Sequence, residues 1–183
     1  MKRASAIVLT LCLLFVAGTA SAQLPYIMVY YDDSYTVGNK DCPPGTPGTV
    51  LDSVYVVAQQ INKWFVGVEY SIAYPIQMIY LAEAVNGGLS IGNTVTGIAQ
   101  TWPIPQNGFQ PALLNKVYFL WNCDGCSVTD IPILVTEHPD LALGGVDFPG
   151  HAYFSVVGMT SLICGTTPEE ETTWGNIKAL YQQ

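Results

Sequence analysis

Positive charge is scarce in this sequence, and beyond residue 22 there is no arginine at all. The positive residues that remain there are Lys40, Lys63, Lys116 and Lys178. Against 14 acidic residues, these four lysines leave a formal net charge of −10. Phosphate backbones and anionic lipid surfaces repel a chain of this charge. The composition therefore excludes nucleic-acid binding, and we expect no nucleic-acid partner.

Long apolar runs are also absent, except at the start of the chain. Lys2 and Arg3 precede an apolar run over residues 6–17, and the small residues 20–22 follow it. This order is typical of a signal peptide, which we expect to span residues 1–22 and to be cleaved before Gln23. No later run reaches the roughly 18 apolar residues that a membrane span needs. The sequence predicts a secreted protein (extracellular, periplasmic or at the cell surface) without a membrane span.

Motifs that carry catalysis are missing too. No serine lies in a G-x-S-x-G elbow, and the glycine pairs at 87–88 and 144–145 indicate turns, not phosphate-binding loops. A glycosidase needs two placed carboxylates, for which Glu69 and Glu83 qualify by residue type alone. We therefore expect no catalytic residue, no cofactor and no metal site, and we predict that the protein is not an enzyme.

What the sequence does contain is a succession of short β-rich runs separated by glycine, proline and asparagine. Their alternating apolar positions predict strands. The expected strands are residues 26–31, 50–58, 64–73, 89–99, 116–121, 131–135, 151–157 and 161–164. Residues 76–84 fit either a short helix or a strand, and residues 102–111 (with three prolines) and 137–150 read as loops. The pattern predicts an all-β, antiparallel β-sandwich over residues 23–164, of the jelly-roll or the immunoglobulin-like type.

The segment 113–135 is the centre of this interpretation. Val117, Phe119 and Trp121 share one face of its first strand, because side chains alternate along a strand. Asp124-Gly125, between the two strands, is a dipeptide that favours a tight turn. We therefore expect a hairpin here.

Cysteine is present in a pattern that fits export. Cys42, Cys123, Cys126 and Cys164 remain after cleavage, and an even number in a secreted chain predicts two disulfides. Three pairings are open; we favour Cys123 with Cys126 across the turn, which leaves Cys42 with Cys164. A redox site at C-x-x-C or a zinc site with all four thiols is less consistent with the β-rich flanks and the absence of a second C-x-x-C.

Two acidic stretches contain possible metal ligands. Their residues are Glu137, His138, Asp140, Asp147 and His151 in one, and Asp32, Asp33 and Asp41 in the other. Neither spacing matches a ligand motif, so we interpret both stretches as solvated loops.

Aromatic residues give a possible ligand platform. Trp64, Trp102 and Tyr35 are the candidates for stacking on a sugar, if their rings are exposed. Exposed rings would favour carbohydrate binding, and converging carboxylates or a Ser-His pair would favour a hydrolase.

The C-terminus differs from the rest. Residues 165–173 form an acidic, proline-containing linker, and residues 174–183 predict a short helix with one apolar face. That face consists of Trp174, Ile177, Leu180 and Tyr181. So short a helix is unstable alone, and it must dock either on this protein's own sandwich or on a partner or sorting apparatus.

The runs PGTV at 47–50, VYVVA at 54–58, VGVEYSIAYP at 66–75 and LLNKVYFLW at 113–121 resemble, in their order, cohesin-like domains. The signal peptide, the early VYYDD and the final TTWGNIKALY also resemble a group of uncharacterised secreted bacterial sandwich proteins. The resemblances imply a secreted sandwich. We expect a non-enzymatic binding, adhesion or structural module whose partner is an unknown protein or glycan; a carbohydrate-binding module and a secreted hydrolase are the alternatives.

Overall fold

The computed structural model describes residues 24–40, 48–122 and 131–163, and every regular element in that part of the chain is a β-strand. The strands are β1 (Tyr26–Tyr30), β2 (Asn39–Lys40), β3 (Thr49–Gln59), β4 (Trp64–Ala73), β5 (Met78–Val85), β6 (Leu89–Asn93), β7 (Gly97–Asn107), β8 (Ala112–Asn122), β9 (Ile131–Thr136), β10 (Gly144–Asp147), β11 (Tyr153–Ser155), β12 (Val157–Gly158) and β13 (Thr160–Ile163). The all-β prediction is confirmed.

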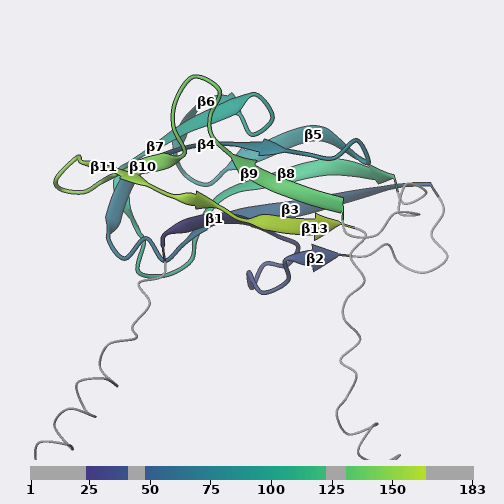
Figure 1. Cartoon of the computed structure of the whole chain (residues 1–183), viewed down its shortest axis with the longest axis horizontal. Coiled ribbons are helices and arrows are strands. Elements are labelled where there is room, and N and C mark those ends of the chain that lie inside the picture. Colours follow the sequence, from purple (N-terminus) through teal and green to yellow (C-terminus); the bar gives the residue numbers. More distant parts are fainter. Residues whose placement is uncertain (1–23, 41–47, 123–130, 164–183) are drawn as a thin grey trace, which may run out of the picture.

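The strands form two sheets that face each other (Figure 1). One sheet has the order β12-β1-β3-β8-β5, in which only the β12–β1 pair is parallel. In the other sheet β4 is the hub, because it pairs with β7, β9 and β10. β6 extends that sheet beyond β7, β11 extends it beyond β10, and β13 and β2 extend it beyond β9. The fold is therefore a β-sandwich, as the strand pattern predicted.

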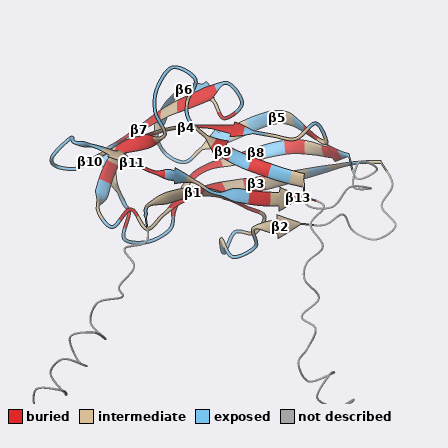
Figure 2. Cartoon of the chain, in the orientation of Figure 1, coloured by how far each residue is buried: buried red, intermediate tan, exposed pale blue. Residues whose placement is uncertain are grey.

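The core lies between the sheets, where side chains of β1, β3, β4, β7 and β8 are buried (Figure 2). From β8 the core takes Val117, Phe119 and Trp121, the three residues predicted to share a face. Opposite them, β4 contributes Phe65 and Tyr70. Each fully buried side chain of this size stabilises the fold by roughly 1.5–3 kcal/mol relative to an exposed one.

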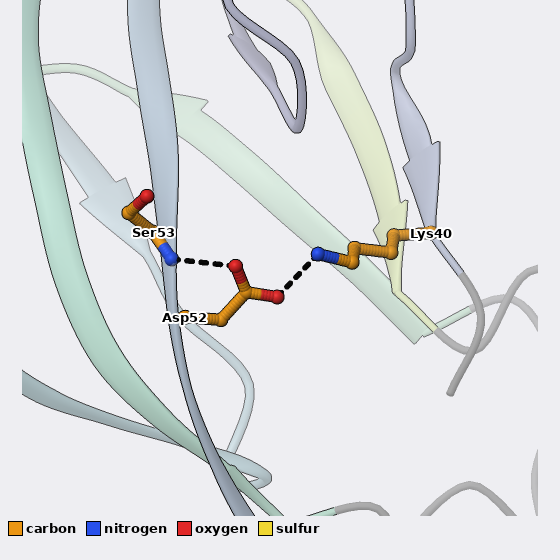
Figure 3. Close-up of polar contacts among 3 residues, drawn as sticks. All are labelled: Lys40, Asp52 and Ser53. Atoms are coloured by element: carbon orange, nitrogen blue, oxygen red, sulfur yellow. Dashed lines mark hydrogen bonds and ion pairs between the residues drawn. The ribbon is translucent and has the colours of Figure 1, made fainter. Parts of the chain in front are cut away.

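An ion pair ties the two sheets together at one end. Lys40 at the end of β2 donates to a carboxylate oxygen of Asp52 in β3, and the second Asp52 oxygen accepts the backbone N–H of Ser53 at 2.8 Å (Figure 3). The Lys40 ammonium also lies 5.9 Å from the ring centroid of Trp121 and 6.0 Å from that of Tyr31. Burial, followed by the Asp52 charge, raises the pKa of Tyr31 well above its usual range. The pair is only partly exposed, so water screens it less than a surface ion pair.

The prediction of a single strand over residues 89–99 is wrong. The segment is a hairpin, β6 and β7, with a turn at residues 94–96. The side-chain oxygen of Asn93 accepts the backbone N–H groups of Val95 and Thr96, both at 2.9 Å, and Gly97 follows at φ 103°. Local side-chain hydrogen bonds of this kind turn the chain where propensity alone favours extension.

The loop predicted at residues 102–111 is also wrong, because β7 continues to Asn107. Thr101 pairs with Gly67 and Gln106 pairs with Phe65, and the register shifts between these positions. Pro103 and Pro105 fall in that irregular stretch, where a missing N–H costs no ladder hydrogen bond. The predicted loop over residues 137–150 likewise contains β10, and residues 76–84, left open between helix and strand, form most of β5.

The expected hairpin at residues 113–135 does not form. β8 pairs with β3 and β5 in one sheet, whereas β9 pairs with β4 and β13 in the other, so the chain crosses between layers there. The signal peptide, the four cysteines, the acidic linker and the C-terminal helix all lie outside the described residues. Within the described part, no helix is long and apolar enough to cross a membrane.

Candidate functional site

The candidate site is the outer face of the sheet built on β4. The pairing register places side chains from five strands in two rows across this face. The first row is Leu89, Thr101, Gly67, Val146 and Tyr153, and the second is Ile91, Ala99, Glu69, Gly144 and Ser155. Residues directly opposite one another in neighbouring strands point to the same face.

The face is hollow because its central residues are small. Gly67 is the middle residue of the first row and Ala99 lies beside Glu69 in the second, whereas Leu89, Ile91 and Val146 stand around them. The result is a concavity of about 630 Å³, with Leu141 from the segment before β10 contributing to its wall. We call this surface the groove; its main lining residues are Val66, Gly67, Glu69, Leu89, Ile91, Ala99, Thr101, Leu141 and Val146.

The groove is lined largely by apolar side chains that water reaches. Leu89 is 73% exposed and Ile91 is 81% exposed, and both belong to β6, the edge strand next to β7. Leu141 and Tyr153 are about half exposed on the other side. Single exposed apolar residues are ordinary on proteins, but a contiguous set around a concavity marks a binding surface.

Glu69 is the charged residue of the groove lining, and Tyr153 lies at one end of the face. Burial raises the pKa of the Tyr153 hydroxyl, and the charges of Glu69 and Glu137 raise it further. The two carboxylates therefore favour the neutral form of Tyr153.

The three residues predicted as a ligand platform do not form one. Trp102 is only 4% exposed; its ring packs edge-on against Phe65 at 5.7 Å, and its Nε1–H donates to the Asn86 carbonyl at 2.6 Å. Trp64 is exposed at the start of β4, whereas Tyr35 packs on the other sheet. Trp102 faces the core because β7 buries alternate residues, and its ring is therefore not available for stacking on a sugar.

The acidic and histidine residues around 137–151 serve other contacts. Asp147 forms an ion pair with Lys63 at 3.6 Å and accepts the Ala152 backbone N–H at 2.8 Å. His138 Nδ1 accepts the backbone N–H of Asp140 at 3.1 Å. Among residues 24–40, 48–122 and 131–163, no three His, Cys, Asp or Glu side chains come together as a metal site would require.

The carboxylate of Asp32 is likewise occupied by its own turn. It accepts hydrogen bonds from the backbone N–H groups of Thr36 at 2.9 Å and Val37 at 2.6 Å, and from the hydroxyls of Ser34 and Thr36. Burial alone would raise the pKa of Asp32, but these hydrogen bonds outweigh it and hold the pKa well below its usual range. The turn thereby fixes Tyr35, which has a φ of 58°.

The two carboxylates considered for catalysis do not converge. Glu69 faces outward into the groove, whereas Glu83 lies on β5 in the opposite sheet and accepts the backbone N–H of Thr94 at 3.0 Å. The groove residues Leu89, Ile91, Leu141 and Tyr153 were not singled out from the sequence. The alternation of Leu89 and Ile91 was visible, but alternation does not reveal which face of a strand is covered.

No protein-family model and no curated protein sequence matches this chain. The chain is similar in structure to a cohesin chain from the CaDoc0917–CaCohA2 complex, with 17% sequence identity, a TM-score of 0.52, and coverage of 78% of this chain and 99% of the other. It is also similar to a non-cellulosomal cohesin from the archaeon Archaeoglobus fulgidus, with 12% identity, a TM-score of 0.49, and coverage of 83% and 98%. The first similarity shows that the sandwich has a cohesin-like fold.

Proposed function

We propose that the protein is a secreted, non-enzymatic binding module, and that the groove binds a second protein. The observation that carries this proposal is the contiguous exposed apolar lining, in which Leu89 and Ile91 stand over a concavity of about 630 Å³. A concavity of this size accepts several side chains of a partner, and apolar contacts in a hollow are where binding energy concentrates.

The structural neighbour supports a protein as the partner. The similar cohesin chain was solved in a complex with CaDoc0917. By analogy of fold, the partner of this chain is a protein module that presents a compact apolar surface. Because Glu69 and Glu137 lie near Tyr153, at one end of the groove, we expect the partner to place a lysine or arginine beside its apolar contacts.

The proposed site also fits a module without catalytic activity. Glu69 is the charged residue in the groove lining. Glu83 lies on β5 in the opposite sheet, and its carboxylate accepts the backbone N–H of Thr94. The groove therefore offers shape and apolar area to a partner, which is what adhesion and scaffolding require. Removal of residues 1–22 during export would place this surface outside the cytoplasm.

The test is a binding measurement on the mature chain (residues 23–183). Immobilised protein is probed with a panel of dockerin modules, the class of protein that the cohesin neighbours bind, and, in parallel, with a glycan array. We expect saturable binding of a protein probe, weakened by roughly 30-fold or more when Leu89→Asp and Ile91→Asp are combined, since the loss of both apolar contacts together should cost about 2 kcal/mol or more.

The matched control is Leu51→Asp combined with Ile79→Asp, on the outer face of the other sheet. These residues are 66% and 54% exposed, so the control carries the same chemical change on similarly exposed positions. The proposal requires that this control bind the probe as the unmodified chain does. Equal weakening by both variants, or binding to glycans that the groove variant retains, would contradict a protein site in the groove.

A further inference from the structure

The outer face of the five-stranded sheet is a second unusual surface. The register places its outward side chains in rows across β1, β3, β8 and β5. The rows are Tyr30, Tyr55, Lys116 and Ala84; then Ser53, Tyr118 and Ala82; then Leu51, Leu120 and Ile79. We call this surface the tyrosine face. Its last row leaves Leu51 and Ile79 more than half exposed, and Leu81 beside them is exposed as well.

Lys116 lies at the centre of the tyrosine face with an unusual set of neighbours. Its ammonium is 5.0 Å from the ring centroid of Tyr55 and 5.4 Å from that of Tyr118. Among the three lysines that the structure describes, Lys40 and Lys63 form ion pairs with Asp52 and Asp147. Lys116 forms no ion pair within 4 Å with a described residue; its hydrogen bond with Tyr55 and the more distant charge of Asp33 raise its pKa. A cation held over two rings beside exposed apolar residues favours an occupant that is both acidic and apolar.

The chain leaves the sandwich at the end where the apolar row of the tyrosine face lies, but from the opposite sheet. Ile163, the last described residue, pairs with Lys40, and Lys40 reaches across the core to Asp52, the neighbour of the outward-facing Leu51 in β3. Figure 1 shows the tips of β13 and β8 at the same end of the sandwich. A segment that follows Ile163 therefore reaches the tyrosine face by passing around this end of the sandwich.

Those residues have the matching chemistry. The acidic run at 169–171 precedes the apolar residues Trp174, Ile177 and Leu180. Ten residues separate Ile163 from Trp174, and ten or eleven extended residues reach up to about 36 Å. The eleven-residue strand β3 has about the same length, so every part of the tyrosine face lies within reach.

We propose that the C-terminal segment, residues 169–181, docks on the tyrosine face of its own chain. The carboxylates of residues 169–171 approach Lys116, and Trp174 and Ile177 cover the row that contains Leu51 and Ile79. The groove is the less favourable seat for the acidic run, because its lining contains Glu69 and no lysine, whereas Lys116 lies on the tyrosine face. Docking also supplies the tertiary contact without which so short a helix does not form. This inference is independent of what the groove binds.

Hydrogen exchange of the mature chain tests the docking directly. We expect the amides of residues 174–181 to be protected at micromolar concentration, with a protection that does not change on tenfold dilution. Combining Leu51→Asp with Ile79→Asp should reduce that protection at least tenfold. The matched variant Leu89→Asp with Ile91→Asp, in the groove, should leave it unchanged.

A charge reversal provides a second readout if the apolar variant fails to fold. Lys116→Glu should lower the protection of residues 174–181, and adding Glu169→Lys, Glu170→Lys and Glu171→Lys to the same chain should restore it. Absence of protection in the unmodified chain would overturn the proposal, as would protection that both double variants reduce equally. Protection that disappears on dilution would show that a second copy, not the same chain, supplies the contact, and would also overturn it.

Discussion

The groove and the tyrosine face are the two outer sides of one sandwich, and both combine apolar side chains with charge. Across the groove, glycine and alanine occupy the centre and the large apolar residues stand at the edges, with carboxylates beside Tyr153. Across the other face, tyrosines fill the centre around Lys116, and the apolar residues lie at one end. The difference shows how the pairing register alone, by aligning small or large residues across neighbouring strands, makes one face concave and the other filled.

Reduction of the cysteines should have the largest effect on stability, and it should leave binding at the groove intact. We expect two disulfides and no free thiol in the exported protein, with the Cys42–Cys164 bridge closing a loop of roughly 120 residues. Reduction should then cost about 4–5 kcal/mol of unfolding free energy. Thiol titration under denaturing, non-reducing conditions counts the bridges, and urea unfolding with and without reductant measures the cost. Two or more free thiols per chain would refute the prediction of two disulfides. Probe binding to the groove should survive mild reduction below the unfolding transition.

Adding a methyl group to two glycines should distinguish the edge of the groove from its floor. A Cβ at Gly144 would overlap the hydroxyl of Tyr153 and the carbonyl of Phe154, so Gly144→Ala should cost about 1–3 kcal/mol by overpacking. A Cβ at Gly67 would meet its nearest neighbour, the Gln100 carbonyl oxygen, at 3.4 Å, so Gly67→Ala should change stability by less than about 1 kcal/mol while making the groove shallower. Urea unfolding gives the two stabilities. Equal costs would mean that β11 does not pack over Gly144 as described.

The smallest effect concerns the turn that carries Tyr35 to the tyrosine face. Asp32→Asn should cost about 1–2 kcal/mol at pH 7, because the turn loses charge-assisted hydrogen bonds from Ser34, Thr36 and Val37. Since the folded pKa of Asp32 is lowered, its contribution is complete above the unfolded value near 4 and declines as the pH falls towards the folded pKa. The stability difference between the two chains should therefore narrow between pH 5 and pH 2, as thermal unfolding at several pH values would show. Asp33→Asn, at an exposed neighbouring position, is the control. An equal loss of stability in that variant would argue against a stabilising role for the hydrogen bonds of Asp32.

Much of the sandwich was predictable because alternation is a local signal. The inward face of β8, with Val117, Phe119 and Trp121, followed from residue spacing, and burial confirms it. Strand pairing was not predictable in the same way. The segment 113–135 has the local signature of a hairpin, yet β8 and β9 belong to different sheets, because the partners of a strand depend on contacts far away in the sequence.

The groove could not be predicted for the same reason. Its hollow depends on Gly67 lying between Thr101 and Val146, three residues that are far apart in the sequence. Composition marked Trp102 as a candidate for an exposed ring, but the parity of β7 placed it in the core. Leu89 and Ile91 looked like ordinary strand residues, and only the edge position of β6 leaves them uncovered.

The last strands of the domain join both sheets, and this has a mechanical consequence. β12 lies parallel to β1 in one sheet, and two residues later β13 pairs with β9 in the other. If the two termini are pulled apart, as happens to a module fixed at one end to a surface and loaded at the other, the force acts along β1 and β12 in opposite directions. Hydrogen bonds between parallel strands loaded in this way are sheared together, not peeled one after another. The two residue pairs between β1 and β12, Tyr26 with Val157 and Ile27 with Gly158, are therefore the contact that such a force would load in shear.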